Sequence, residues 1–362
     1  MALGPVLGGW LVDHVSWRWI FFINLPLAAA VLLVLVARVP ESHGENEKAR
    51  LDWWGAILMT GGLGAVIYGL IELPILGAGH PLIVATLVGG VAALAAFLVI
   101  EWRGSAPLVP LGLFRSRSFS GANLLTLLLY AALSGSIFYL PFNLIQVQGY
   151  TATEAGAALL PLIAVMFLLS RWSGTLLDRY GGRLPLTVGP LIAAAGFLLF
   201  ALPGIGGSYW TTFFPAVLVL GLGMAVVAPP LTTVVMNAVD DHNAGVASGI
   251  NNAVSRVGGL LAVAVMGIIV LMTFNNNLDK QLVPLDVSPE VRTALDAERI
   301  NLAGAKLPES LAAELRGSLE RAIDTSFVSA FRLAMFIAAG LAMASALSAV
   351  VFIEKRPPAP AA

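Results

Sequence analysis

The chain of 362 residues contains no cysteine, and only 11% of its residues are charged whereas 58% are hydrophobic. The absence of cysteine excludes disulfides, thiol catalysis and cysteine-ligated metal sites. Soluble domains carry about 25% charged residues, so the deficit of charge indicates an integral membrane protein. Histidine is also scarce, and no metal site is predicted because all four histidines lie at the edges of apolar segments or between them: His14, His43, His80 and His242.

Several apolar segments approach the length of about 20 residues that an α-helix needs to cross a bilayer. Nine of them are long enough to be full spans: 19–37, 53–72, 82–101, 119–141, 154–172, 184–202, 211–236, 244–272 and 328–353. Residues 1–12 are apolar but too short to cross, so they are expected to be an interfacial piece or the end of a partial span. The sequence therefore predicts an all-α polytopic membrane protein, a helical bundle of about nine full spans plus a partial first span.

Lysine and arginine are distributed unevenly between the loops, and this asymmetry predicts the orientation of the chain. Loops rich in these residues lie on the cytoplasmic side of membrane proteins. The basic segments are the loops 38–52, 102–118 and 171–183 and the tail with Lys355 and Arg356. The alternate loops contain neither residue: 73–81, 141–152 and 203–210. We therefore expect an integral protein of the cell membrane with a cytoplasmic C-terminus.

One long polar segment, residues 273–327, falls on the opposite side of the membrane in this topology. Ser288-Pro289-Glu290 has the residues of a helix N-cap and first turn. Residues 308–324 place apolar side chains at helical spacing opposite mixed charges. The segment is therefore expected to form an extracytoplasmic helical hairpin or an extension of the neighbouring helices.

The loop between two spans at 170–186 carries an unusual group of glycines and charges: Gly174, Asp178, Arg179, Gly181 and Arg183. A carboxylate so close to a membrane interface needs a partner, because burying it alone is costly. This spacing resembles the cytoplasmic loop signature of the major facilitator superfamily. The resemblance implies a gating loop that pairs charges between the two halves of a carrier. The alternative interpretation is an ordinary basic loop that orients the chain.

The first residues contain a second motif, GPVLGGW, with Gly4, Pro5, Gly8 and Gly9. Small residues four apart let two membrane helices approach closely. Together with the junction at residues 17–26, the motif resembles the antiporter signature on the fifth span of drug:proton antiporters of this superfamily. The resemblance implies that this helix packs against the other half of the carrier and helps to seal its outer side.

If residues 1–12 correspond to the fifth span, nine more spans complete a fourteen-span, major facilitator-type carrier whose first four spans are absent from this chain. The resemblance then implies six segments. They are the last two helices of the N-terminal half-bundle (1–38), a cytoplasmic loop (39–52), two extra central spans (53–101), a second cytoplasmic loop (102–118), a six-helix C-terminal half-bundle (119–272 and 328–353) and an extracytoplasmic helical loop (273–327).

Two stretches of the predicted C-terminal half have unusual composition. Pro229-Pro230 removes two helix donors inside a span, so a break or bend is expected where neighbours can satisfy the freed backbone. Residues 243–259 place small and polar side chains near one helix face, which predicts a packing seam: Gly245, Ser248, Gly249, Asn252 and Arg256. The residues expected to line a central cavity are polar or aromatic: Asn123, Tyr130, Tyr139, Asn143, Gln146, Asn252 and Arg256.

The family resemblance implies a secondary active transporter that exports drugs or other small amphipathic molecules by proton antiport with alternating access. It implies no cofactor beyond the proton gradient, a small-molecule substrate and the lipid bilayer as partners, and no nucleic acid; a periplasmic adaptor stays open. No Asp or Glu lies at mid-depth of a predicted span, so proton coupling follows from the resemblance alone.

Two alternative functions remain. The first is a truncated carrier remnant that does not transport, in which case residues 1–362 alone are inactive. The second is a membrane-embedded enzyme, which is disfavoured because the sequence has no HExxH or GxSxG motif and no intramembrane acid pair.

Overall fold

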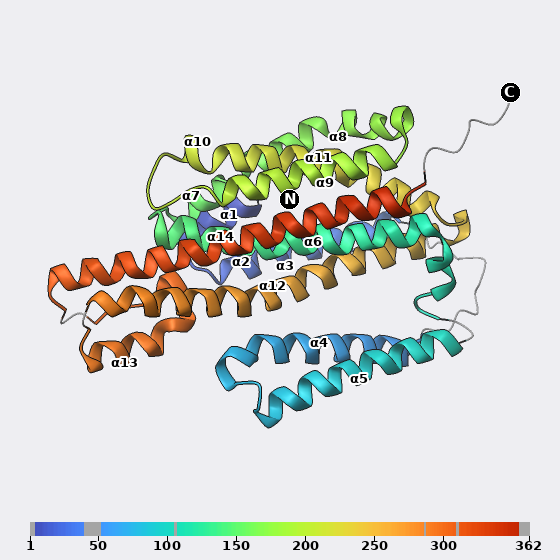
Figure 1. The fold of residues 1–362 in the computed structure, drawn as a ribbon. Helices are drawn as coiled ribbons and strands as arrows, with labels where there is room; N and C mark the ends of the chain where they lie inside the picture. The colour runs from blue at the N-terminus through green and yellow to red at the C-terminus, as the bar shows by residue number, and fades with distance from the viewer. Residues whose placement is uncertain (1–3, 40–51, 105–106, 286, 309–310, 355–362) are drawn as a thin grey trace.

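The computed structural model describes residues 4–39, 52–104, 107–285, 287–308 and 311–354, without the side chain of Asp178. The predicted loop 39–52 and the basic tail with Lys355 and Arg356 therefore lie largely outside the described residues. The described residues form helices and no strand (Figure 1). Nine helical stretches in them are long and apolar enough to cross a membrane, so the predicted all-α polytopic class and the nine spans are confirmed.

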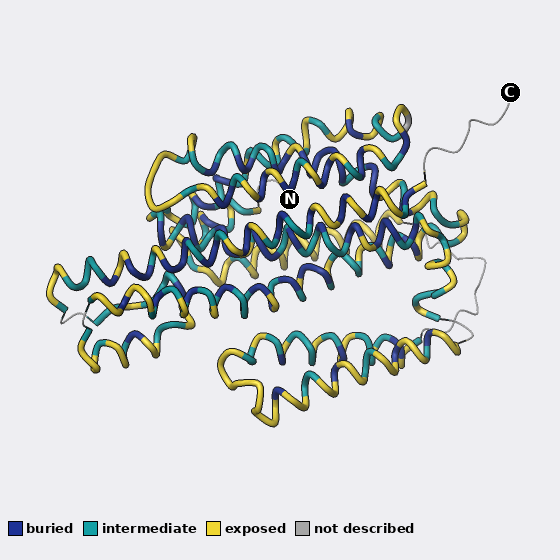
Figure 2. Tube along the Cα trace, in the orientation of Figure 1, coloured by how far each residue is buried: buried dark blue, intermediate teal, exposed yellow. Residues whose placement is uncertain are grey.

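Six helices form the main bundle of the described chain (Figure 1). They are α6 (Arg117–Phe142), α8 (Leu160–Tyr180), α9 (Arg183–Phe200), α11 (Phe214–Asn237), α12 (Ala244–Leu282) and α14 (Ala313–Phe352). In this bundle α14 packs against α6, α9 and α12, and α11 packs against α8 and α9. Their inner faces carry most of the buried residues (Figure 2). On α14 the buried residues include small alanines, which let this helix approach its neighbours closely: Ala330, Ala334, Ala338 and Ala342.

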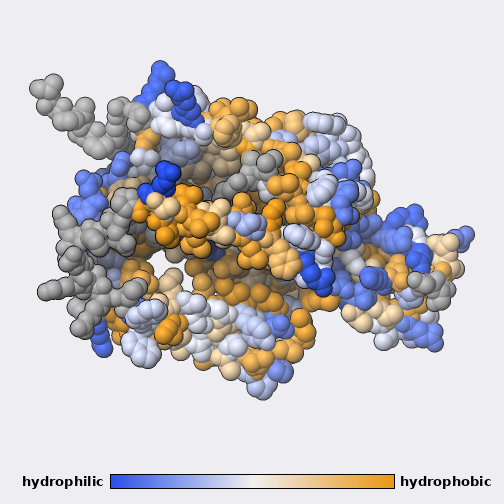
Figure 3. Space-filling view, turned by 180° about the vertical axis from the view of Figure 1, so that it is seen from behind, coloured by the Kyte–Doolittle hydropathy of each residue, from blue (hydrophilic) through white to orange (hydrophobic). Residues whose placement is uncertain are grey.

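Short elements connect the long helices. They are a π-turn η2 (Asn143–Val147) after α6, α7 (Ala152–Ala157) before α8, α10 (Tyr209–Thr212) before α11, and the 3₁₀ turns η1 (Leu111–Arg115), η3 (Asp241–Asn243) and η4 (Val283–Leu285). Polar residues gather at the two ends of the molecule and apolar residues between them (Figure 3). This distribution is the one expected of a bundle whose middle faces lipid.

Two further groups of helices flank the bundle. The helices α4 (Trp53–Leu76) and α5 (Pro81–Arg103) pair with each other, and α4 also contacts α12. The helices α1 (Gly4–His14), α2 (Trp19–Phe22) and α3 (Asn24–Arg38) expose most of their side chains, and no residue of α3 is buried. Their main contact with the rest of the described chain is that between α1 and α7.

The segment predicted as a hairpin or a helix extension combines both. α12 has 39 residues and α14 has 40, which gives lengths of about 58 and 60 Å, roughly twice the hydrocarbon thickness of a bilayer. Both helices project beyond the bundle and carry α13 (Pro289–Glu298) and η5 (Arg299–Gly304) between them (Figure 1). We call this the hairpin end, and the opposite end, with loop 171–183, the basic end. The predicted cap is confirmed, since the Ser288 hydroxyl accepts from Val291 N at 3.4 Å.

Ion pairs hold the hairpin together around Arg299, whose side chain is 15% exposed. Its guanidinium donates to Asp279 at 2.6 Å and to Asp296 at 2.7 Å, which joins η5 to α12 and α13. We expect Arg299→Leu to detach this segment at a cost of about 1–3 kcal/mol, because Asp296 loses its salt bridge and Asp279 keeps only the longer contact with Arg292 among the described ion pairs. Faster hydrogen exchange over 289–304 would report the detachment. Arg292→Leu is the matched control, since Arg292 is more than half exposed and 3.7 Å from Asp279, and it should leave exchange unchanged.

A break or bend is predicted at Pro229-Pro230; α11 remains helical through both prolines, so the helix does not break there. In a regular helix the amide of residue 230 would donate to the carbonyl of Val226, and proline has no such amide. The hydroxyl of Ser173, a fully buried residue on α8, lies 3.5 Å from that carbonyl. A neighbouring helix therefore supplies the missing donor, which is the condition under which membrane helices tolerate proline.

Candidate functional site

The helix with the antiporter-like motif meets the bundle at α7, at the hairpin end. Asp13, which follows the apolar part of α1, accepts hydrogen bonds from the first residues of α7. Its Oδ2 lies 2.7 Å from Thr153 N and 2.5 Å from Thr153 Oγ1, and its Oδ1 lies 3.3 Å from Ala152 N. α7 also has a capping box, in which Thr151 and Glu154 bond each other's backbone amides. The amides of the first turn of α7 therefore have two side-chain acceptors, Thr151 in the capping box and Asp13 from α1.

The hydrogen bonds from Thr153 hold the pKa of Asp13 below its ordinary value of 3.8, with the hydroxyl of Thr153 as the main cause. They stabilise the charged carboxylate more than the neutral acid, whose oxygens are weaker acceptors. Because the contact lowers the pKa of Asp13, the stabilisation that Asp13 gives to the contact is fully present above the ordinary pKa. This stabilisation is lost as the pH falls through the lowered pKa. The contact is therefore stronger with an ionised Asp13 than with a protonated one.

The backbones of α1 and α7 also touch directly in this contact. A Cβ added to Gly9 would collide with the backbone of Ala152 and Thr153, and one added to Gly156 would collide with the carbonyl of Pro5. Gly4 and Gly8, in contrast, have no atom within 4 Å of such a Cβ. Of the four predicted motif residues, only Pro5 and Gly9 therefore touch α7. We call this contact of α1 with α7 the glycine seam.

The predicted gating loop lies at the basic end. Gly181 has φ +72° and ends α8, a conformation that favours glycine. The guanidinium of Arg183 donates to the carbonyl of Val350 on α14, and that of Arg179 lies 5.5 Å from the centre of the Tyr180 ring. A Cβ on Gly174 would meet no atom within 4 Å. The salt bridges found between described side chains all lie in the hairpin, so charge pairing by this loop, including Asp178, stays a prediction.

The packing seam predicted on α12 stays a prediction, since four of its five residues are exposed in the described part of the chain. Asn252 and Arg256 are exposed, and a Cβ on Gly245 or Gly249 would meet no atom within 4 Å. The polar contact comes from the next residue instead. Asn251 Nδ2 donates to Asn123 Oδ1 at 3.1 Å and to Thr126 Oγ1 at 2.7 Å, joining α12 to α6. Sequence reasoning missed Asn251 because its partners are far away in the chain.

Neighbouring asparagines give a direct test of this assignment. We expect Asn251→Leu to destabilise the α6–α12 contact by about 1–3 kcal/mol, because buried polar groups lose their hydrogen bonds. Asn252→Leu should change stability by no more than about 0.5 kcal/mol, since an exposed surface position has little to lose. Thermal unfolding of the two variants, purified in the same lipid, measures the difference. Equal effects at both positions would contradict the assignment.

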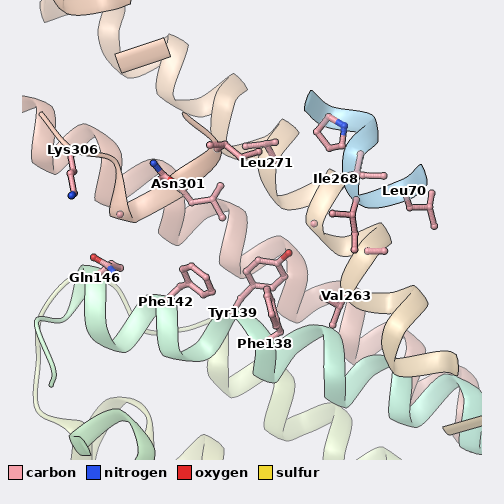
Figure 4. A pocket seen from close by; sticks show the side chains of 17 residues that line it. Leu70, Phe138, Tyr139, Phe142, Gln146, Val263, Ile268, Leu271, Asn301 and Lys306 are labelled. Atoms are coloured by element: carbon pink, nitrogen blue, oxygen red, sulfur yellow. The ribbon is translucent and has the colours of Figure 1, made fainter. Parts of the chain in front are cut away.

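A cavity of about 730 Å³ lies between α4, α6, α12 and η5 (Figure 4). Of the predicted cavity residues, Tyr139 and Gln146 line it, whereas five do not: Asn123, Tyr130, Asn143, Asn252 and Arg256. Asn143 is buried and accepts a hydrogen bond from Gln148 at 3.1 Å. Sequence reasoning missed the aromatic neighbours Phe138 and Phe142, although they recur at four-residue spacing with Tyr139 between them.

The sequence profile of the Major Facilitator Superfamily matches residues 1–263 of this chain. The chain belongs to the Major Facilitator Superfamily. Its fold class, its membrane spans and both sequence motifs agree with this membership, which places it in a family of transporters and not of enzymes. The predicted relationship to this superfamily is confirmed.

Curated relatives within the superfamily are resistance and export proteins. The tetracenomycin C resistance and export protein of Streptomyces glaucescens is 32% identical over 365 residues, covering 99% of this chain and 66% of the relative. The lincomycin resistance protein of Streptomyces lincolnensis is 35% identical over 267 residues, or 73% of this chain and 55% of the relative. The chain thus spans about half to two thirds of the length of these relatives.

A solved structure is also similar. It is a bacterial homolog of the human lysosomal transporter Spinster, in an inward-facing and occupied conformation, with 16% sequence identity and a TM-score of 0.48 over 99% of this chain and 82% of the other.

Proposed function

We propose that this chain acts in the export of drugs or other small amphipathic molecules, by proton antiport with alternating access. The observation that carries the proposal is the glycine seam, where the helix with the antiporter-like motif meets α7, the short helix before α8 of the six-helix bundle, and Gly9 and Gly156 let the two backbones touch. Such a contact is held by close packing and a few hydrogen bonds, so it can open and close as a unit. The resistance and export relatives support the same activity.

The orientation belongs to the proposal. We infer that the basic end faces the cytoplasm, because Arg115, Arg117, Arg179 and Arg183 lie there, and that the hairpin end faces outward. The glycine seam then lies on the outer side. Its closed contact supports a conformation sealed outside, with the loop 171–183 available as the gating loop on the inner side.

The assignment of segments completes the proposal. Residues 119–272 and 328–353 form the C-terminal half-bundle, residues 1–38 belong to the N-terminal half-bundle, and residues 53–101 are the extra central pair. Support comes from the packing of α6 to α14 around one core, and from the separate pairing of α4 with α5. Proton coupling has no acid at mid-depth of these spans to support it and follows from the family alone.

A gene deletion in the source cell tests the proposal. The measurement is the accumulation of ethidium, a fluorescent amphipathic cation. We expect accumulation to rise on deletion, and a protonophore to abolish the difference from the parent strain. Restoring the gene should restore export, whereas restoring it with Gly9→Leu should not. Unchanged accumulation of ethidium and of a panel of neutral and cationic drugs would contradict the proposal, and export that survives the protonophore would contradict proton coupling.

A further inference from the structure

The cavity between α4, α6, α12 and η5 lies beside the six-helix bundle, at the hairpin end (Figures 1 and 4). Its volume of about 730 Å³ falls within the range of roughly 300–1,000 Å³ that is typical of small-molecule sites. One wall belongs to α4 of the central pair, and the others belong to the bundle and the hairpin. The cavity therefore exists only because the central pair rests against α12.

Most of the wall is apolar. Leu70 comes from α4, Phe138 and Phe142 from α6, and Ile268 and Leu271 from α12. The hydroxyl of Tyr139 points into the space (Figure 4) and makes no hydrogen bond within the described chain. Such a surface suits the hydrocarbon chain of a ligand, because the apolar chain is removed from water when it enters the cavity.

Polar groups are confined to one end of the cavity, next to η5. Gln146 and Lys306 point toward each other across this end (Figure 4), and Asn301 lies beside them. Lys306 is the one charged side chain among the residues that line the cavity. Its ammonium forms no salt bridge with a carboxylate in the described ranges.

One acidic side chain close to Lys306 is already engaged. Glu298 accepts hydrogen bonds from Asn301 Nδ2 at 2.8 Å and from the backbone amide of Lys306 at 3.2 Å, and these bonds, with a smaller contribution from the charge of Lys306, lower its pKa. Glu298 thereby fixes the turn that presents Lys306 and does not itself line the cavity. The ammonium group of Lys306 is left as a donor for another acceptor.

We propose that this cavity binds one hydrocarbon chain of an amphiphile with an acidic head group. The chain lies against the apolar wall, and the carboxylate or phosphate head accepts hydrogen bonds from Lys306 and Gln146. A cationic amphiphile would suit the aromatic rings, but its head would meet the like charge of Lys306. Charge therefore selects the anion. The site is separate from the glycine seam, and binding to it does not depend on transport.

Such a ligand has two sources, which share this chemistry. A free fatty acid reaches the site from water, and an anionic lipid reaches it from the bilayer, because the hydrophobic wall continues into the lipid-facing surface of α4, where Ile71 is 52% exposed. Both place one hydrocarbon chain in the cavity and one acidic group at Lys306.

The test uses the purified full chain in nanodiscs of phosphatidylcholine and the fluorescent fatty acid 11-(dansylamino)undecanoate as probe. We expect saturable binding, and at least several-fold weaker binding of a dansyl probe with the same chain length and a trimethylammonium head. Lys306→Gln should weaken the acidic probe about tenfold and abolish the preference for it, since a charge-assisted hydrogen bond is lost. Lys280→Gln is the matched control, because Lys280 is an exposed lysine of the same hairpin outside the cavity.

A second variant tests the cavity independently of charge. Gly267 lines the wall opposite Tyr139, and an added Cβ would lie 3.3 Å from its hydroxyl. Gly267→Leu should fill the space and weaken both probes, while its unfolding temperature shows whether the fold is kept. Equal binding of the two probes, an unchanged preference in Lys306→Gln, or full binding to a folded Gly267→Leu would overturn the proposal. Displacement by myristate alone indicates the soluble acid as source, and displacement by phosphatidylglycerol in the disc indicates the lipid; displacement by neither overturns it.

Discussion

Replacing Gly9 with leucine is expected to separate α1 from α7, whereas the same replacement at Gly8 is expected to leave them together. The two glycines are adjacent in one motif, but only Gly9 lies against the backbone of Ala152 and Thr153. A side chain there forces the helices apart at a cost of about 1–3 kcal/mol, which corresponds to about a 5- to 150-fold increase in the separated population. At Gly8 leucine meets open space and improves helix propensity.

Spin-label mobility measures this separation. The chain has no cysteine, so a single cysteine needs no background changes. Val12 on α1 is 43% exposed, and a nitroxide on Val12→Cys should become more mobile in Gly9→Leu and stay restricted in Gly8→Leu. Gly156→Leu should reproduce the effect from the α7 side, because a Cβ there collides with the carbonyl of Pro5. Equal mobility in the Gly8 and Gly9 variants would refute the glycine seam.

The second large effect is expected from pH. The carboxylate of Asp13 holds the start of α7 more strongly when it is ionised, and its lowered pKa keeps it ionised down to a pH below 3.8. The contact should therefore be constant at neutral pH and weaken as the pH falls through that lowered value. Asp13→Asn keeps the shape but cannot titrate, so its contact should be weaker at neutral pH and should not respond to acid.

A nitroxide on Leu7→Cys, attached at neutral pH before the titration, follows this change. Leu7 is 44% exposed and lies a turn and a half of helix away from Asp13, so the label does not replace a contact residue. Glu154→Gln is the control, because Glu154 is the other carboxylate at this helix start and belongs to the capping box. An acid response that persists in Asp13→Asn and disappears in Glu154→Gln would assign the effect to the capping box of α7.

Together the two results would show whether the glycine seam depends on shape, on charge or on both. The comparison also bears on transport. If the seam is the outer seal of an exporter, Gly9→Leu and Asp13→Asn should both reduce export of ethidium, and Gly8→Leu should not. Loss of export in all three variants would instead mean that the whole motif packs against residues outside those described.

Sequence reasoning succeeded where the signal is local. The apolar segments predicted the spans because the thickness of the bilayer fixes the length of a helix that crosses it. Ser288 predicted a helix start, which the structure confirms, because a cap depends on neighbouring residues only. Pro229-Pro230 predicted that a neighbour would satisfy the freed backbone, but no local pattern could identify Ser173 on another helix as that neighbour.

The polar contact between α12 and α6 likewise depends on residues that are distant in the sequence. Asn252 was chosen as a cavity residue by its composition and its place in a small polar face, but the neighbouring Asn251 makes the contact with α6. A rotation of about 100° separates consecutive residues of a helix, so the direction in which a helix faces decides which of the two is buried. That direction follows from packing against α6, α11 and α14 and is not written in the segment itself.

The sequence by itself determined the membrane class, the number of spans and the superfamily, because hydrophobic length and short motifs carry these properties in consecutive residues. Only the tertiary structure decided that Gly9 and not Gly8 touches α7, that Asp13 holds Thr153 140 residues away, and that Lys306 shares a cavity with Phe138 and Leu70. The physical reason is that these pairs are brought together by the packing of whole helices, whose rotation and depth depend on all of their neighbours at once.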